Sequence, residues 1–500
     1  MMSAGMDPAA GASDGVNAPP TRRQGPRLAT NAVWLGAAQV ATVALSLGLT
    51  IAISRWLGTA SLGQWRLAQA IVSYLLVVAD AGLSSLAIRE IARNPSKTSA
   101  YGTPIVALQV AVATVLFFSL AVVLALVALP TDMWLLTMLL AAVAFPQALS
   151  LGHVLQGREA MSVVARLRVA MQLASTVGGI VLLAITGSLV WVSPPILLST
   201  FIAAGVTFAY VRHRFDIAIR LPTRPEVGLL ARGAAPFLVA ALAVQVILNA
   251  DALLIGALSG VTDLGLYAAA YAIAAQMLAL GGPLMTAAFP RLSSSGADAR
   301  LDLLRRLCSF LGYFIFPAAI GLALISDLFI DLLYGSAYVA SGPVLAILVA
   351  LPLFGYYNMA VGQTLGASRH QRSVMVVSLM TAGINIGLNL LLIPRLGITG
   401  AAITVVASEL ATAAAFSILL RRHLSGQVVT TYFENLPSVA IMSITLIVLR
   451  AAGIDQLLVL IFVGATVFVL SSLALPSFAR SFLRDLIASR RGRRSSGGTP

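Results

Sequence analysis

The sequence predicts an all-α polytopic membrane protein with about fourteen transmembrane helices, arranged as two six-helix lobes and two further C-terminal helices. Of its 500 residues, 59% are hydrophobic and only 10% are charged, whereas soluble domains carry about 25% charged residues. Apolar runs of about 20 residues, the length that crosses a bilayer, recur from residue 30 to residue 475 with short interruptions. Part of the first group of runs also recurs in the second group.

The apolar runs define the expected order of domains. The expected domains are a disordered cytoplasmic tail at 1–28, an N-terminal lobe at 29–212, a cytoplasmic linker at 213–233, a C-terminal lobe at 234–423, two additional helices at 424–476 and a basic cytoplasmic tail at 477–500. The expected spans are 30–53, 63–88, 103–129, 133–154, 168–187 and 189–211 in the first lobe, 234–258, 264–289, 307–326, 342–366, 374–393 and 397–420 in the second, and finally 437–453 and 456–475.

The basic residues predict which side of the membrane each loop occupies. The formal net charge is +14, and with the N-terminus inside, only four of the 32 Lys and Arg residues fall on outward segments, namely Arg55, Arg66, Arg395 and Arg450. This distribution predicts a multi-pass protein of the bacterial cytoplasmic (inner) membrane with both termini in the cytoplasm. The basic clusters lie between apolar runs, which indicates contact with anionic membrane lipids and not with nucleic acid.

The chain carries no recognisable catalytic or metal-binding pattern. Its one cysteine, Cys308, and its four histidines lack ligand spacing, so we expect no metal and no disulfide. A phosphate-binding loop and a G-x-S-x-G motif are also missing from the sequence, so we expect no cofactor and no enzymatic activity. A membrane glycan polymerase would need a large external loop, yet the longest outward segment, 327–341, reads as a short amphipathic piece at the interface.

An internal repeat relates the two groups of spans. At an offset of 202 residues, LGTASLGQWRLAQAI (57–71) aligns with SGVTDLGLYAAAYAI (259–273), and six positions are identical, among them Gly63 with Gly265. Because each unit holds an even number of spans, the lobes are expected to be related by an axis along the membrane normal. Transporters built this way bind substrate between the lobes near the midplane, which makes transport the expected activity.

Three blocks of the chain resemble the Wzx-type polysaccharide flippases, whose superfamily also holds multidrug MATE exporters and the lipid II flippase MurJ. They are SRWLGTASLGQWRLAQAIVSYLLVVADAGLSSLAIREIAR (54–93), NADALLIGALSGVTDLGLYAAAYAI (249–273) with AAFPRLS (287–293), and LGASRHQRSVMVVSLMTAGINIGLNLLLIPRLGITGAAITVVASEL (365–410). The resemblance implies twelve core helices in two lobes, and translocation of undecaprenyl-pyrophosphate-linked oligosaccharide by alternating access. It also implies membrane lipids and polysaccharide polymerase and chain-length proteins as partners, with the monomer as the working unit.

Polar residues inside the spans are the candidate substrate contacts, because charged groups in a bilayer usually face the bundle interior. On the second span, five polar residues fall within about 60° of arc on a helical wheel, which predicts a polar stripe along a central cavity. These residues are Arg66, Gln69, Ser73, Asp80 and Ser84. Arg66 is the candidate ligand of the pyrophosphate; the alternative is that Arg66 extends to the surface and Asp80 caps a helix or pairs with Arg89.

Further candidates lie on other spans. The other expected substrate contacts are Gln39, Gln245, Asn249, Asn385, Tyr267 and Tyr271. Residues of these types also join helices or anchor them at the interface. Glu409 and Asp251 are candidate ion-coupling residues, since a buried carboxyl suits proton exchange. A cation-coupled multidrug exporter on the same scaffold remains the main alternative function, ahead of a glycan polymerase or a non-transporting scaffold protein.

Overall fold

The structure, a computed structural model, describes residues 25–127, 129–215, 220–368, 370–424 and 428–475. These residues form helices and connecting turns, with no β-strand among them. The first half contains α1 (Gly25–Asp80), α2 (Leu83–Arg93), η1 (Pro95–Lys97), α3 (Thr98–Tyr101), α4 (Thr103–Leu126), α5 (Thr131–Ala141), α6 (Ala144–Leu149), α7 (Gly152–Gly157), α8 (Met161–Thr186), η2 (Leu189–Val192) and α9 (Ser193–Phe215).

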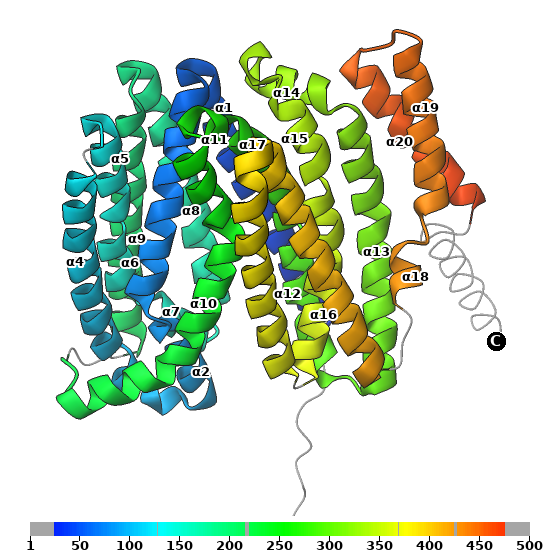
Figure 1. Cartoon of the computed structure of the whole chain (residues 1–500). Coiled ribbons are helices and arrows are strands. Elements are labelled where there is room, and N and C mark those ends of the chain that lie inside the picture. Colours follow the sequence, from blue (N-terminus) through cyan, green and yellow to red (C-terminus); the bar gives the residue numbers. More distant parts are fainter. Residues whose placement is uncertain (1–24, 128, 216–219, 369, 425–427, 476–500) are drawn as a thin grey trace, which may run out of the picture.

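The second half has the same all-helical character. It contains α10 (Arg224–Leu258), α11 (Val261–Ala279), α12 (Gly282–Ser294), α13 (Ala297–Leu324), α14 (Ser326–Tyr334), η3 (Ser336–Tyr338), α15 (Ser341–Leu348), α16 (Ala350–Ala367), α17 (Gln371–Leu424), α18 (Val429–Tyr432), α19 (Leu436–Ala451) and α20 (Leu457–Ala474). In Figure 1 α4 to α9 lie on one side of the molecule, α12 to α17 lie toward the middle, and α19 and α20 form the opposite edge.

Twelve helical segments of the described chain are long and apolar enough to cross a membrane. Two of them, Gly36–Asp80 with 45 residues and Gln371–Arg422 with 52, are far longer than one crossing, because about 20 residues suffice. Each contains a glycine with positive φ, Gly58 (82°) in α1 and Gly397 (56°) in α17. Counting each as two crossings gives fourteen, as the sequence predicts.

Hydrogen bonds show that α17 folds back on itself at Gly397. Thr381 pairs with Thr412 at 2.6 Å, and Asn385 donates to Ser408 at 3.4 Å, so partners approach the glycine from both sides in antiparallel register. Figure 1 shows the two halves of α17 descending side by side from the same end of the molecule. Thr381 and Asn385 in the first half of α17 therefore join it to the second half.

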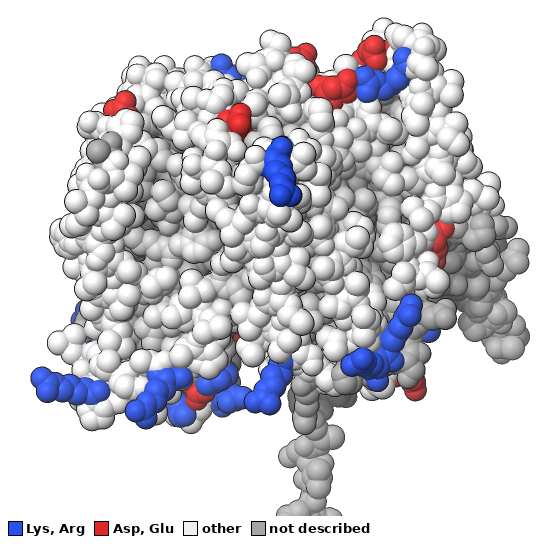
Figure 2. Space-filling view, in the orientation of Figure 1, with Lys and Arg blue, Asp and Glu red and all other residues white. Residues whose placement is uncertain are grey.

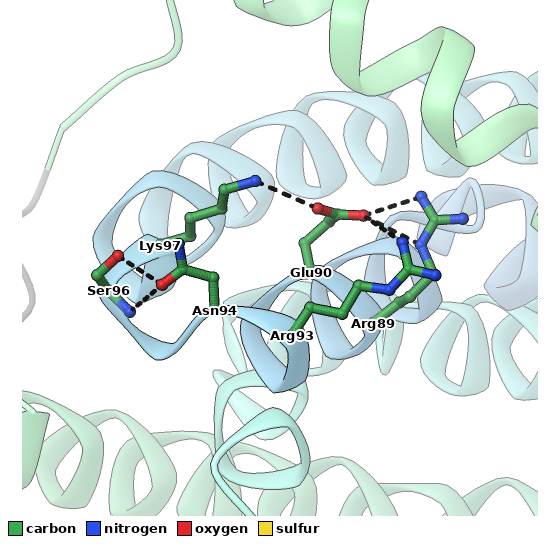
Figure 3. A network of polar contacts seen from close by, with 6 residues as sticks. All are labelled: Arg89, Glu90, Arg93, Asn94, Ser96 and Lys97. Atoms are coloured by element: carbon green, nitrogen blue, oxygen red, sulfur yellow. Dashed lines mark hydrogen bonds and ion pairs between the residues drawn. The ribbon is translucent and has the colours of Figure 1, made fainter.

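Basic side chains collect at one end of the helix bundle, which we call the basic face (Figure 2). Part of it is the turn after α2, where Glu90 accepts from Arg89 at 3.1 Å and from Lys97 at 3.4 Å (Figure 3). Asn94 closes the turn by accepting from the backbone amide and the hydroxyl of Ser96. The end of the bundle that lies across the membrane from the basic face is called the opposite face below.

The segment between the two lobes is shorter than the linker predicted at 213–233. Helix α9 continues to Phe215, and α10 begins at Arg224, about ten residues before the expected span at 234. A capping box explains the early start, since Thr223 and Glu226 satisfy each other's backbone amides. Figure 1 shows the first part of α10 running along the basic face before the helix turns, and Pro236 lies inside it.

The outward segment expected at 327–341 contains the short helix α14, held from both sides. Arg55 of α1 donates to the carbonyl of Leu333 at 2.8 Å, and Arg450 of α19 binds Asp327 at 2.6 Å. Partial burial raises the pKa of Asp327, but the bonds from Arg450 outweigh it and hold the pKa below its usual value. The tails at 1–24 and 476–500, including the predicted basic surface segment, lie outside the described residues.

Candidate functional site

The two lobes meet along a seam between the second half of α1 and α10. Arg66 donates to Oδ1 of Asn249 at 2.8 Å and to the carbonyl of Leu248 at 3.1 Å. One helical turn earlier on α10, Gln245 donates to the hydroxyl of Ser73. Three of these residues, Arg66, Gln245 and Asn249, were predicted to contact substrate, and in this structure they also join the N-terminal and C-terminal lobes.

Arg66 is partly buried and only partly satisfied in this seam. Its guanidinium carbon lies 5.2 Å from the centre of the Tyr271 ring, a cation–π geometry. Its Nε atom is buried and has no hydrogen-bond partner. The carboxylate of Asp251, fully buried nearby, accepts instead from the Tyr267 hydroxyl and from the backbone amide of Ala252 at 2.7 Å. Arg66 thus has no carboxylate among the hydrogen-bond partners that the described residues give it.

A polar cavity of about 350 Å³ lies beside Arg66, between α1 and α8 of one lobe and α11 of the other. Its polar and aromatic lining comprises Ser46, Thr50, Trp65, Arg66, Gln69, Gln172, Ser175, Tyr271 and Gln276. Among the described residues of this lining, Arg66 carries the only formal charge. This lining suits a ligand with hydroxyl groups and a negative charge. The three amide side chains can donate and accept hydrogen bonds, and they lie with a tryptophan beside a single cation.

A second cavity of about 210 Å³ lies between α10, α11, α16 and α17. Most of its lining is apolar and includes Ile247, Leu278, Leu351, Met359 and Val405. Its polar lining consists of Tyr271, Asn385, Ser408 and Glu409. We call it the apolar pocket, in contrast to the polar cavity above.

The polar groups of the apolar pocket bind one another. Glu409 accepts from the amide of Asn358 at 2.6 Å, and Asn385 accepts from Asn389 at 3.0 Å. Asn385 and Glu409, predicted to contact substrate and to couple an ion, therefore lie on the same pocket wall. Asp251 is not part of this wall, because it lies buried beside Tyr267.

Asp80 lies apart from the polar cavity. It accepts from Gln109 of α4 at 2.8 Å and from Ser84, inside the N-terminal lobe, and lines a separate space of about 50 Å³. The predicted stripe through Arg66, Asp80 and Ser84 is therefore wrong in its second part. The helix breaks after Asp80, where Ala81 (φ 52°) and Gly82 (φ 73°) lie, so Ser84 belongs to a separate helix, α2. Arg89 pairs with Glu90 and not with Asp80.

The structure sorts the remaining predicted residues by their access to the two cavities. Arg66 and Gln69 line the polar cavity, and Tyr271 lines both cavities. Tyr267 is fully buried, so it cannot stack on a sugar in this conformation. Gln39 is half-buried on α1 and lines neither cavity. The polar cavity is also lined by Gln172, Ser175 and Gln276, which were not predicted. Their only signal in the sequence is a polar residue within an apolar run.

The described residues hold no group of three or more His, Cys, Asp or Glu placed to bind a metal ion. His153, near the basic face, is buried, and its Nε2 lies 3.2 Å from the carbonyl of Tyr101. Burial lowers the pKa of His153 to about 4.

Two lobes of membrane-crossing helices around a polar cavity define a class of protein, the multi-spanning membrane proteins built from two helical lobes. A solved lipid II flippase, MurJ in an inward closed conformation, superposes with a TM-score of 0.71 at 14% identity, covering 91% of this chain and 100% of that one. The chain belongs to the polysaccharide biosynthesis protein family, whose model matches residues 28–295, more than half of its length. The family resemblance predicted from the sequence is thereby confirmed.

Other similar proteins differ in the activity that their names state. An inward-facing multidrug resistance MATE transporter of the MOP superfamily superposes with a TM-score of 0.60 at 14% identity, covering 78% of this chain and 98% of that one. A protein named probable flippase AglR, from Haloferax volcanii, is 26% identical over 254 residues, covering 48% of this chain and 52% of its own. The chain thus spans about half the length of this curated relative.

Proposed function

We propose that the protein is a flippase that moves undecaprenyl-pyrophosphate-linked oligosaccharide across the bacterial cytoplasmic membrane, by alternating access, for surface or exopolysaccharide biosynthesis. The basic face would be cytoplasmic, because positive charge gathers on that side of membrane proteins. Membrane lipids, and polysaccharide polymerase and chain-length proteins, are the proposed partners of a working monomer.

The observation that carries this proposal is the charge of the polar cavity. Its described lining holds one cation, Arg66, and no carboxylate, together with the amides of Gln69, Gln172 and Gln276. A pyrophosphate would be attracted by the guanidinium, and the sugar hydroxyls would bind the amide groups. The prenyl chain could stay in an apolar environment, so the glycan would cross without exposure to hydrocarbon.

The rival function is a cation-coupled multidrug exporter, which the MATE-like fold fits equally well. A cationic drug would need a carboxylate or another negative group near its positive charge, and the described lining of the polar cavity offers a cation in that place. The buried carboxyls of Glu409 and Asp251 are therefore proposed to couple an ion, and not to bind substrate.

The test uses the purified full-length protein in liposomes with fluorescent polyprenyl-pyrophosphate-linked oligosaccharide, scored by accessibility of the glycan from each side. We expect wild type to flip this substrate, Arg66→Ala to lose at least about tenfold in rate, and Arg66→Lys to lose less. Arg306→Ala, an exposed arginine paired with Asp302, is the matched control and should act as wild type. Export of cationic drugs without flipping would favour the rival. Full flipping by Arg66→Ala at equal protein level would contradict the role given to Arg66.

A further inference from the structure

The apolar pocket and the polar cavity are neighbours that share part of one helix. Tyr271 and Ala275 of α11 line both spaces. On one side of these residues lie the amides of the polar cavity, and on the other the aliphatic side chains of α10, α16 and α17. A ligand that occupied both spaces would need a polar part and an apolar part joined over a short distance.

Arg66 marks the boundary between the two spaces. It lines the polar cavity, and its guanidinium stands over the ring of Tyr271. It also donates to the carbonyl of Leu248, whose residue lines the apolar pocket. An anionic group held by Arg66 would therefore lie between a polar space and an apolar one.

We propose that the apolar pocket binds the first isoprene units of the polyprenyl carrier, next to its pyrophosphate. This inference rests on the proposed function and adds a site for the lipid part of the substrate. In a prenyl-pyrophosphate-linked sugar the order is glycan, pyrophosphate, prenyl chain. The order along the protein is polar cavity, Arg66, apolar pocket, so each part of the substrate meets matching chemistry.

The size and chemistry of the pocket fit this occupant. An apolar cavity of about 150 Å³ holds a benzene molecule, with six carbon atoms, so 210 Å³ accommodates about one or two five-carbon isoprene units. The polar atoms of Asn385 and Glu409 are bonded to Asn389 and Asn358, which leaves a largely hydrocarbon surface for a ligand. The side chain of Leu248 is 42% exposed, so the pocket is not sealed, and the remaining chain can continue out of it.

A matched pair of substitutions on α11 separates the two spaces. Ala279 lines the apolar pocket alone, and Ala272, two turns earlier, lines the polar cavity alone. Ala279→Phe fills the pocket, and Ala272→Phe fills the cavity with the same added volume. Binding is measured on purified full-length protein in nanodiscs with two probes, the natural-length polyprenyl-pyrophosphate-linked oligosaccharide and the same glycan pyrophosphate on a two-carbon chain.

We expect wild type to bind the long probe more tightly than the short one. Ala279→Phe should weaken binding of the long probe on the order of tenfold and leave the short probe unchanged, whereas Ala272→Phe should weaken both. The inference is overturned if Ala279→Phe weakens both probes equally or neither. Equal binding of the two probes by wild type would refute the pocket as a prenyl site and leave the proposed function intact. If wild type binds neither probe, the proposed function itself fails. Ala279→Leu, a smaller change with the same expected direction, replaces Ala279→Phe if that variant does not fold.

Discussion

Gly63 of α1 and Gly265 of α11 pack against each other's helices, backbone to backbone, in a nearly symmetric contact. A Cβ on Gly63 would lie 1.7 Å from the carbonyl oxygen of Val261, and one on Gly265 would lie 1.9 Å from that of Thr59. Both contacts obey the 202-residue offset, since Thr59 corresponds to Val261 as Gly63 does to Gly265. The contact therefore lies on the axis that relates the repeats, and only glycine permits so close an approach.

Gly63 lies between Leu62 and Trp65, which line the polar cavity, so we expect this contact to hold the cavity closed at that end. Gly63→Ala is expected to force the two helices apart, because the clash is with backbone, which cannot rotate away as a side chain can. Overpacking costs about 1–3 kcal/mol, enough to shift a two-state population between about fivefold and a little over a hundredfold. The measurement is labelling of Gln69→Cys by impermeant thiol reagents from each side of oriented vesicles, in a Cys308→Ser background.

The labelling experiment has a matched control. Gly383→Ala adds the same methyl group to α17 at a place where a Cβ meets no atom within 4 Å, and labelling should not change. Increased labelling of the Gly63→Ala protein from the opposite face is the expected result. Unchanged labelling of that protein would show that the glycine contact does not hold the cavity closed.

The bond between Arg66 and Asn249 predicts a competition with the substrate. Asn249→Asp puts a carboxylate where the amide oxygen now accepts from the guanidinium at 2.8 Å, and a charge-assisted bond is stronger than a neutral one. A phosphate would have to displace it, so we expect flipping to slow about tenfold or more. The check is a double-mutant cycle: in an Arg66→Ala background the added Asn249→Asp change should have little further effect. Wild-type flipping by Asn249→Asp would contradict the competition.

Burial of His153 predicts loss of stability in acid. Because its pKa falls from 6.5 to about 4 on burial, the unfolded chain binds a proton more readily than the folded one below pH 6.5. The neutral His153 side chain contributes fully to the free energy of unfolding above pH 6.5. This contribution is lost as pH falls toward 4, by up to about 1.4 kcal/mol per pH unit. We expect the Tm of wild type to fall over this window, and that of His153→Gln to fall less. His213→Gln, at an exposed position, should leave the slope unchanged.

Much of the fold could be predicted because a bilayer restricts the chain strongly. A span needs a long apolar run, and positive-φ glycines such as Gly58 and Gly397 mark the places where two runs join. The aligned repeat made Gly63 and Gly265 equivalent positions, but only the structure shows that their helices meet there. The ends of helices were harder to predict from the sequence. Helix α10, for example, begins before its apolar run because a capping box forms at Thr223.

The site could be predicted only in part, because side-chain direction depends on packing that a helical wheel does not contain. Arg66 and Gln69 were placed correctly on the cavity. Asp80 was not, since it packs against Gln109 of α4 within the N-terminal lobe and lines a separate space. Gln172 and Gln276 share the cavity although they are far apart in sequence, and their meeting follows from how α8 and α11 pack.

Glu409 provides the test of energy coupling. Its carboxylate accepts from Asn358 at 2.6 Å and lines the apolar pocket within the C-terminal lobe. A carboxyl group there can exchange a proton, whereas an amide of the same shape cannot, so Glu409→Gln should flip substrate at a rate that no longer depends on the pH difference across the membrane. Glu434→Gln, which alters a glutamate bonded to Ser309 away from both cavities, is the control and should keep the wild-type dependence. The measurement is the flipping rate in liposomes at several imposed pH differences, and a pH dependence retained by Glu409→Gln would remove this residue from the coupling mechanism.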